Sequence, residues 1–256
     1  IDRSDNLQLV TMPGTRVITF QMNQSVVDEF KDPRVRQAVA YAVNNEGIAQ
    51  KIMKGAATPA SQQSPVGYAG YNADLEPRYD LAKAKQLMEE AGYPDGFSVT
   101  MIAPNNRYVN DEKIAQAVSA MMAKIGIKVD LQTMPKAQYW PEFDKCEAGM
   151  QMIGWHPDTE DSANFTEFLT MTRDADSGKG QYNCGHYSNS EVDKLVIAAN
   201  SETDLEKRSA MLQKVEKILY DEAAFLPLHW QDPSWAAKNN VNIKPIVNGM
   251  NFPYFG

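Results

Sequence analysis

Residues 154–161 (GWHPDTED) carry the residue types best suited to ligand binding in this sequence. They leave an apolar run, residues 150–155, whose pattern predicts a buried strand, and Pro157 ends that strand. Side chains beyond this point lie at the carboxyl end of the strand, which is where ligands bind in open α/β sheets. Trp155 offers a flat apolar wall, and Asp158 offers a carboxylate that can pair with a ligand ammonium group.

This segment allows two other interpretations. Asp158 and Asp161 are both suited to capping a helix that begins near Asn164, and Asp161 suits that role better. His156, which we count among the ligand-contacting candidates, also forms a potential cation site with Asp158, Glu160 and Asp161. Three acids around one histidine are, however, common in a solvated turn.

A second polar group, residues 105–108, follows another expected strand and precedes an expected helix. It too lies at the carboxyl end of a strand. Arg107 suits a ligand carboxylate, which a guanidinium can hold through two parallel hydrogen bonds, and Tyr108 stands beside it. A surface salt bridge is the alternative role for Arg107.

Aromatic and amide side chains complete the candidate set. Tyr139 and Trp140 lie in an expected helix, where they either form a ligand wall or pack in the core. Asn183, which follows Tyr182, either hydrogen-bonds a peptide main chain or holds its own loop together.

Motifs for catalysis are missing from the sequence. It contains no G-x-S-x-G elbow, no G-x-x-x-x-G-K-[ST] phosphate loop and no H-E-x-x-H helix. His156, His186 and His229 lack the spacing of metal ligands, and Cys146 has no histidine at a recognisable spacing. We therefore expect a protein that is not an enzyme and that has neither a cofactor nor a metal.

Composition restricts the partners. The 256 residues are 43% hydrophobic and 23% charged, which suits a globular unit with a sizeable core. A net charge of -8 with scattered Lys and Arg argues against nucleic acid and against anionic membranes as partners. The two cysteines, Cys146 and Cys184, are equally compatible with one disulfide in an oxidising compartment and with two thiols. Residues 1–5 resemble neither a chain start nor a signal peptide, so we expect a mature or excised segment.

Alternation and capping signals predict the elements that position these residues. Strands are expected at residues 15–23, 97–103, 127–131, 150–155, 225–229 and 241–246. Helices are expected from Asp32, Asp80 and Asp111, over residues 136–147, and at capping boxes that start at Ser188 and Thr203. The strand–helix–strand order over 97–132 predicts a parallel crossover unit. We therefore expect an α/β fold: one compact unit in which helices flank a mixed sheet.

Residues 32–42 (DPRVRQAVAYA) closely resemble the D-x-R-V-R-Q-A signature of the peptide-binding proteins of ABC importers, the family 5 extracellular solute-binding proteins. This family includes dipeptide-, oligopeptide-, glutathione- and nickel-binding proteins. Further motifs resemble those of the family and follow in its order: KGAA at 54–57, AKQLMEEAGY at 84–93, IGI at 125–127, GW at 154–155, YSN at 187–189 and PLHWQ at 227–231.

The resemblance implies the fold and the role of the chain. It implies that residues 1–256 form one lobe of a bilobal periplasmic-binding-protein type II-like fold. The N-terminal lobe would be absent, and the hinge strands would lie near residues 7–23 and 228–241. The protein would capture peptides or peptide-like solutes and deliver them to the permease subunits of an ABC transporter. We expect a monomer that is periplasmic or, in a Gram-positive cell, extracellular and membrane-anchored.

The resemblance also bears on the ligand. Asp158 occupies the position of the family's aspartate that holds the ligand α-ammonium. Met152 replaces an arginine of the oligopeptide-binding relatives, and Ser162 replaces a proline found in many relatives. The alternatives are a non-peptide solute (a metal chelate, a sugar or an opine-like compound) and a non-transport interaction module. Charges on an open lobe are screened, so we expect the isolated lobe to fold and to bind its solute weakly.

Overall fold

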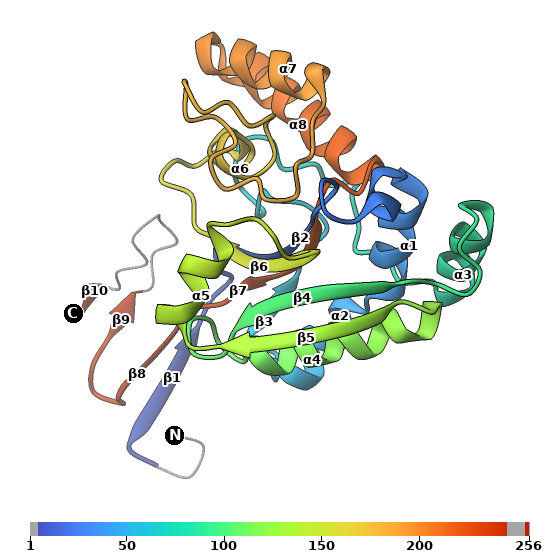
Figure 1. The fold of residues 1–256 in the computed structure, drawn as a ribbon. Helices are drawn as coiled ribbons and strands as arrows, with labels where there is room; N and C mark the ends of the chain where they lie inside the picture. The colour runs from blue at the N-terminus through green and yellow to red at the C-terminus, as the bar shows by residue number, and fades with distance from the viewer. Residues whose placement is uncertain (1–4, 245–253, 256) are drawn as a thin grey trace.

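The central feature of the computed structural model, which describes residues 5–244 and 254–255, is a six-stranded mixed sheet with the order β3-β7-β2-β6-β4-β5 (Figure 1). Its strands are β2 (Arg16–Met22), β3 (Ala57–Pro59), β4 (Ser98–Pro104), β5 (Lys128–Met134), β6 (Met150–Trp155) and β7 (Leu226–Gln231). Strand β4 is parallel to β5 and β6, whereas β2 is antiparallel to β6 and β7. The carboxyl ends of β4, β5, β6 and β7 therefore lie with the amino end of β2 along one edge, which we call the carboxyl edge.

Helices cover both faces of the sheet. One face packs against α1 (Pro33–Ala42), α3 (Leu81–Glu90) and α4 (Asp111–Met122), and together they enclose the largest apolar core. On the other face, Tyr139 and Phe143 of α5 (Lys136–Phe143) meet Ile102 and Ile153. A separate cluster joins α6 (Ser162–Leu169), α7 (Ser190–Ser201) and α8 (Leu205–Asp221), which lie together beyond the sheet (Figure 1). Shorter helical segments are η1 (Asp28–Lys31), α2 (Asn45–Gly47), η2 (Ile48–Ile52) and η3 (Ala123–Ile125).

Short polar side chains begin the helices. Asp32 accepts a hydrogen bond from Arg34 N at 2.9 Å, and Asp80 accepts one from Lys83 N at 2.9 Å, as the sequence predicts. The two capping boxes were each misplaced by one residue. Asn189 caps α7 and Asp204 caps α8, because Asn and Asp cap at least as well as Ser and Thr and stand one position closer to the helix.

The expected strands at 15–23, 97–103, 127–131, 150–155 and 225–229 are confirmed to within a few residues, and β4 and β5 form the predicted parallel pair. The expected helix over 136–147 ends earlier, at Phe143, and Cys146 beyond it has a left-handed φ of 52°. Of the expected strand over 241–246, only β9 (Ile243–Lys244) is seen, and residues 245–246 lie outside the described residues.

A two-stranded ribbon stands apart from the main sheet. Strands β1 (Leu7–Thr11) and β8 (Ser234–Lys238) pair antiparallel, with Leu7 opposite Lys238. The two stretches expected to form a hinge therefore lie side by side, and Figure 1 shows the ribbon extending away from the sheet. Strand β9 pairs with β10 (Tyr254–Phe255). Within the described part of the chain, none of the helices has both the length and the apolar character required to cross a membrane.

Candidate functional site at the carboxyl edge

A hollow of about 490 Å³ opens at the carboxyl edge, where the loop after β4 meets the end of β6. Arg107 and Tyr108 line it from the β4 side, and Trp155 lines it from the end of β6. Trp140 of α5 and Tyr182 of the loop before α7 complete its aromatic walls. Small-molecule sites typically enclose roughly 300–1,000 Å³ and combine apolar walls with a few polar groups, so this hollow has the size and lining of a ligand site.

Tyr108 and Gly154 hold the two strand ends together. Gly154 N donates to the Tyr108 hydroxyl at 2.8 Å. A Cβ at position 154 would lie 2.6 Å from Tyr108 Cε1 and 2.6 Å from Ile18 Cδ1, so only glycine permits this contact. The carboxylate of Asp111 accepts hydrogen bonds from the backbone N–H groups of Arg107 at 2.8 Å and Tyr108 at 3.0 Å. These bonds fix the loop from which the Arg107 side chain extends.

Trp155 and Tyr182, which line the hollow, pack together with a third ring, Phe168. Trp155 packs on Phe168 with 4.9 Å between ring centroids and on Tyr182 with 5.5 Å. Trp155 Nε1 donates to Asn164 Oδ1 at 2.8 Å, which fixes the orientation of the indole. The structure therefore places Trp155 as a rigid aromatic surface at the hollow, as the sequence predicts for an apolar wall.

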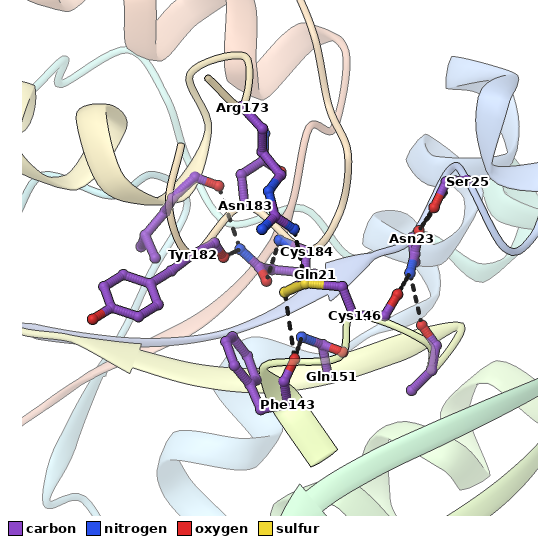
Figure 2. The surroundings of a disulfide bond; sticks show 12 residues. Gln21, Asn23, Ser25, Phe143, Cys146, Gln151, Arg173, Tyr182, Asn183 and Cys184 are labelled. Atoms are coloured by element: carbon purple, nitrogen blue, oxygen red, sulfur yellow. Dashed lines mark hydrogen bonds between the residues drawn. A yellow bond between two sulfur atoms is a disulfide. The ribbon is translucent and has the colours of Figure 1, made fainter. Parts of the chain in front are cut away.

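A disulfide joins this wall to α5. Cys146, just beyond α5, is bonded to Cys184, so the first of the two alternatives for the cysteines is the one the structure contains (Figure 2). Gln21 of β2 binds the same loop, because its Nε2 donates to Tyr182 O at 2.7 Å and its Oε1 accepts from Cys184 N at 3.2 Å. The loop that carries Tyr182 is therefore anchored both covalently and by hydrogen bonds.

Tyr139 and Asn183 face away from the hollow, which corrects their expected ligand contacts. Tyr139 is fully buried and its hydroxyl donates to Met152 O, so it packs in the core, and burial raises the pKa of that hydroxyl. The Asn183 amide donates to Met171 O at 2.9 Å and to Tyr187 O at 2.8 Å, so it holds its own loop together. Their sequence neighbours, Trp140 and Tyr182, line the hollow instead.

Charged groups gather beside the hollow. The Arg107 guanidinium lies over the Tyr108 ring, 4.8 Å from its centroid. Arg16, at the start of β2, is half-buried, and burial followed by the charge of Arg107 lowers its pKa. Thr15 Oγ1 and His156 Nε2 are 3.1 Å apart, and burial followed by the charge of Arg16 lowers the pKa of His156. His156 is therefore neutral at pH 7.

Asp158 is exposed and does not line the hollow, although its charge acts on nearby His156. The structure therefore brings Arg107, Tyr108 and Trp155 together at the hollow, whereas His156 and Asp158 follow Trp155 in the chain and do not line it. Sequence reasoning did not single out Arg16. The signal available was a cationic residue at the first position of a strand expected to be buried.

Asp161 takes the capping role. Its carboxylate accepts from Ala163 N at 3.0 Å and pairs with Arg208 Nη2 at 2.5 Å. Among residues 5–244, no three His, Cys, Asp or Glu side chains are placed to hold a metal ion. The cation-site interpretation of His156, Asp158, Glu160 and Asp161 is therefore not supported.

Comparisons with known proteins identify the family of the chain. Residues 1–177 match the model for the bacterial extracellular solute-binding proteins, family 5 Middle. The glutathione-binding protein GsiB of Salmonella typhi is 31% identical over 234 residues, which are 88% of this chain and 44% of GsiB. The heme-binding protein A of Haemophilus influenzae is 32% identical over 226 residues, which are 87% of this chain and 40% of that protein.

Solved structures share the fold. The periplasmic binding protein DppA from Helicobacter pylori, in complex with peptide STSA, superposes with a TM-score of 0.84 at 28% identity. That match covers 94% of this chain and 46% of DppA. HbpA2 from Haemophilus parasuis, at 21% identity, has a TM-score of 0.85 and covers 100% of this chain and 51% of HbpA2. The chain spans less than half the length of the two curated relatives described above.

Proposed function

Because the chain belongs to family 5 of the bacterial extracellular solute-binding proteins, we propose that it is one lobe of a receptor that captures peptides or peptide-like solutes for an ABC importer. The observation that carries this proposal is the aromatic hollow at the carboxyl edge, with the Arg107 guanidinium on its wall and the exposed Asp158 carboxylate three residues beyond Trp155. A zwitterionic peptide needs this combination of one anion, one cation and apolar surface between them.

Each charged group has a specific role in the proposal. Arg107 binds the ligand carboxylate, and the bonds from Asp111 to its loop hold it in place. Asp158 binds the ligand ammonium. Trp155 and Tyr182 pack against the ligand side chains, and binding involves no covalent chemistry.

A second lobe would complete the site. On an open lobe Asp158 is exposed, and an ion pair there contributes about 0–1 kcal/mol. Closure of a second lobe over the hollow would exclude water and strengthen both pairs. We propose that the β1–β8 ribbon is the connection to that lobe, since it extends away from the sheet (Figure 1). The isolated chain is then expected to fold but to bind weakly.

The remaining expectations follow from the same proposal. The receptor would act as a monomer outside the cytoplasm, and its partners would be the permease subunits of the importer. The Cys146–Cys184 disulfide supports this compartment, because such bonds persist in oxidising surroundings. The names of relatives suggest two particular solutes, glutathione and heme, as alternatives to an ordinary peptide.

Calorimetry on the full-length protein tests the proposal with a panel of dipeptides, tripeptides, glutathione and heme. We expect peptide binding that Asp158→Asn weakens at least tenfold. Glu160→Gln is the matched control, because it removes an exposed charge from the same loop without touching the ammonium site. Peptide binding that is indifferent to Asp158→Asn would move the ammonium site elsewhere. Binding of heme alone, or of no solute in the panel, would contradict the peptide assignment.

A further inference from the structure

Arg16 does not itself line the hollow, but it lies at the same carboxyl edge on a different strand. Val17 is paired with Trp155 across the β2–β6 ladder, so Arg16 stands just beyond the end of β6. Side chains alternate along a strand, so Arg16 projects from the same face as Ile18. That is the face on which the Tyr108 ring covers Gly154, because Ile18 and Tyr108 both approach the position of a Gly154 Cβ. Arg16 therefore projects beside Tyr108 and toward the loop that carries Arg107.

The electrostatics agree with this placement. The charge of Arg107 lowers the pKa of Arg16, and the charge of Arg16 lowers the pKa of His156. These groups are therefore close enough to act on one another. His156 is neutral at pH 7, but a guanidinium stays protonated, so two positive charges remain at this point of the edge.

Within residues 5–244 neither of these two arginines forms an ion pair, although the Asp144 carboxylate lines the same hollow as Arg107. Neither guanidinium forms an ion pair or donates a hydrogen bond to the described protein atoms. The Arg107 guanidinium lies over the Tyr108 ring, and Arg16 has no such ring contact. The other described arginines all have acceptors. Arg34 and Arg208 pair with carboxylates, Arg36 and Arg78 donate to backbone carbonyls, and Arg173 donates to a sulfur atom. Two neighbouring, half-buried cations that form no ion pair are unfavourable, and a bound anion would relieve this repulsion.

We propose that Arg16 binds a second acidic group of the ligand, so that the solute carries two carboxylates, one held by Arg107 and the other by Arg16. This inference rests on the proposed function and narrows its substrate class to acidic peptides and peptide-like dicarboxylates. A single carboxylate between the two arginines would satisfy only one subsite. A neutral peptide would leave Arg16 desolvated and without an anion.

An isosteric pair of ligands separates the second charge from every other property. Alanyl-glutamate and alanyl-glutamine differ only in the carboxylate proposed to bind Arg16. Calorimetry on the full-length protein would compare both peptides, and also glutarate, which has two carboxylates but no ammonium. The variants are Arg16→Gln, Arg107→Gln, Arg16→Lys to restore the charge, and Arg34→Gln as a control on the exposed face of α1.

We expect the unaltered protein to bind alanyl-glutamate about 10- to 100-fold more tightly than alanyl-glutamine, since charge-assisted bonds have about that effect. Arg16→Gln should reduce this ratio to near one while changing alanyl-glutamine binding little. Arg16→Lys should restore part of the ratio, and Arg34→Gln should leave it unchanged. Arg107→Gln should weaken both peptides.

Three results would overturn the assignment of Arg16. The unaltered protein could bind the two peptides equally, or Arg16→Gln could weaken the binding of both peptides equally. The third is a preference for alanyl-glutamate over alanyl-glutamine that depends on Arg107 alone. Each of these leaves the peptide-receptor proposal intact. Binding of glutarate without any peptide would instead support the two-carboxylate site and contradict the peptide function. Absence of binding by all three ligands would contradict both.

Discussion

Ionisable groups are shielded from water both at the carboxyl edge and in the interior beneath residues 60–64. The two regions differ in whether these groups keep their charge. In the interior, Glu216 of α8 is fully buried and accepts hydrogen bonds from Gln63 N at 3.2 Å and Ser64 N at 3.0 Å. Burial raises the pKa of Glu216 to about 8, so its carboxyl is mostly protonated at pH 7. At the edge, Arg16 and Arg107 keep their charges, because a guanidinium does not lose its proton in proteins.

The difference separates a structural group from the groups that we propose to bind the ligand. A buried carboxyl can shed its charge and satisfy its oxygens within the fold, so Glu216 needs nothing from outside. A half-buried guanidinium without an anion has no such option. Its unfavourable environment is relieved only when a negatively charged group binds. For this reason we assign the carboxyl edge, and not the surroundings of Glu216, to the ligand.

The largest expected effect concerns Glu216→Gln. Because the folded pKa of about 8 exceeds the ordinary value of 4.5, the protonated carboxyl stabilises the fold fully below about pH 4.5, and this contribution is lost as pH rises through 8. Relative to Glu216→Gln, the unaltered protein should lose free energy of unfolding on the order of 5 kcal/mol over this range. Urea unfolding of both proteins at several pH values measures the loss. A difference that does not change with pH would mean that Glu216 is ionised in the fold, and the contrast with the edge would fail.

Removal of the disulfide should have the next largest effect. Cys146 and Cys184 are 38 residues apart, and the double serine variant should lower the free energy of unfolding by about 4 kcal/mol. It should also weaken ligand binding, because the loop with Tyr182 loses its covalent anchor. Chemical denaturation and calorimetry measure the two effects. Glu216→Gln is the matched comparison, since it should leave the affinity for the ligand unchanged. An unchanged affinity in the double serine variant would mean that the loop with Tyr182 does not contribute to the binding site.

Tyr108→Phe tests the contact between the two strand ends. The change removes the acceptor for Gly154 N and should cost about 1–2 kcal/mol of stability, as expected when a partly buried N–H is left without a partner. Affinity should fall as well, because the hydroxyl holds the loop that carries Arg107 against the end of β6. Thermal unfolding and peptide binding report the two effects. Loss of stability without any loss of affinity would make Tyr108 a purely structural residue.

The smallest effect is expected from Arg16→Gln in the ligand-free protein. Removing a cation that repels Arg107 should leave the free energy of unfolding unchanged or raise it by up to about 1 kcal/mol. Arg36→Gln is the control, since its guanidinium is buried and donates to the carbonyls of Phe30 and Glu222. That variant should be strongly destabilised. A comparable loss from Arg16→Gln would show that Arg16 supports the fold.

Local patterns predicted much of the fold and part of the site. Caps such as Asp32 act on the next few residues, and an apolar run that ends at Pro157 fixes a strand end, so the sequence alone placed Trp155 and Arg107 at one edge. The direction of side chains on a short helix was harder to predict from the sequence. Tyr139 and Trp140 are adjacent in a helix of 8 residues, and only packing against Ile102 and Ile153 determines which of them is buried.

Contacts between distant segments could not be predicted. The role of Arg16 depends on the β2–β6 register and on Tyr108, which is 92 positions further along the chain. The amide of Asn183 is used by Met171 and Tyr187, and neither contact follows from its neighbours in sequence. The pairing of the cysteines likewise depends on where the loop after α6 returns to α5.

A crystal structure of the full-length protein with bound alanyl-glutamate would locate all three proposed charge contacts at once. We expect the peptide to lie at the carboxyl edge against Trp155 and Tyr182, with its ammonium paired to Asp158, its terminal carboxylate to Arg107 and its side-chain carboxylate to Arg16. A peptide bound away from this edge, or one whose carboxylates contact neither arginine, would contradict the account.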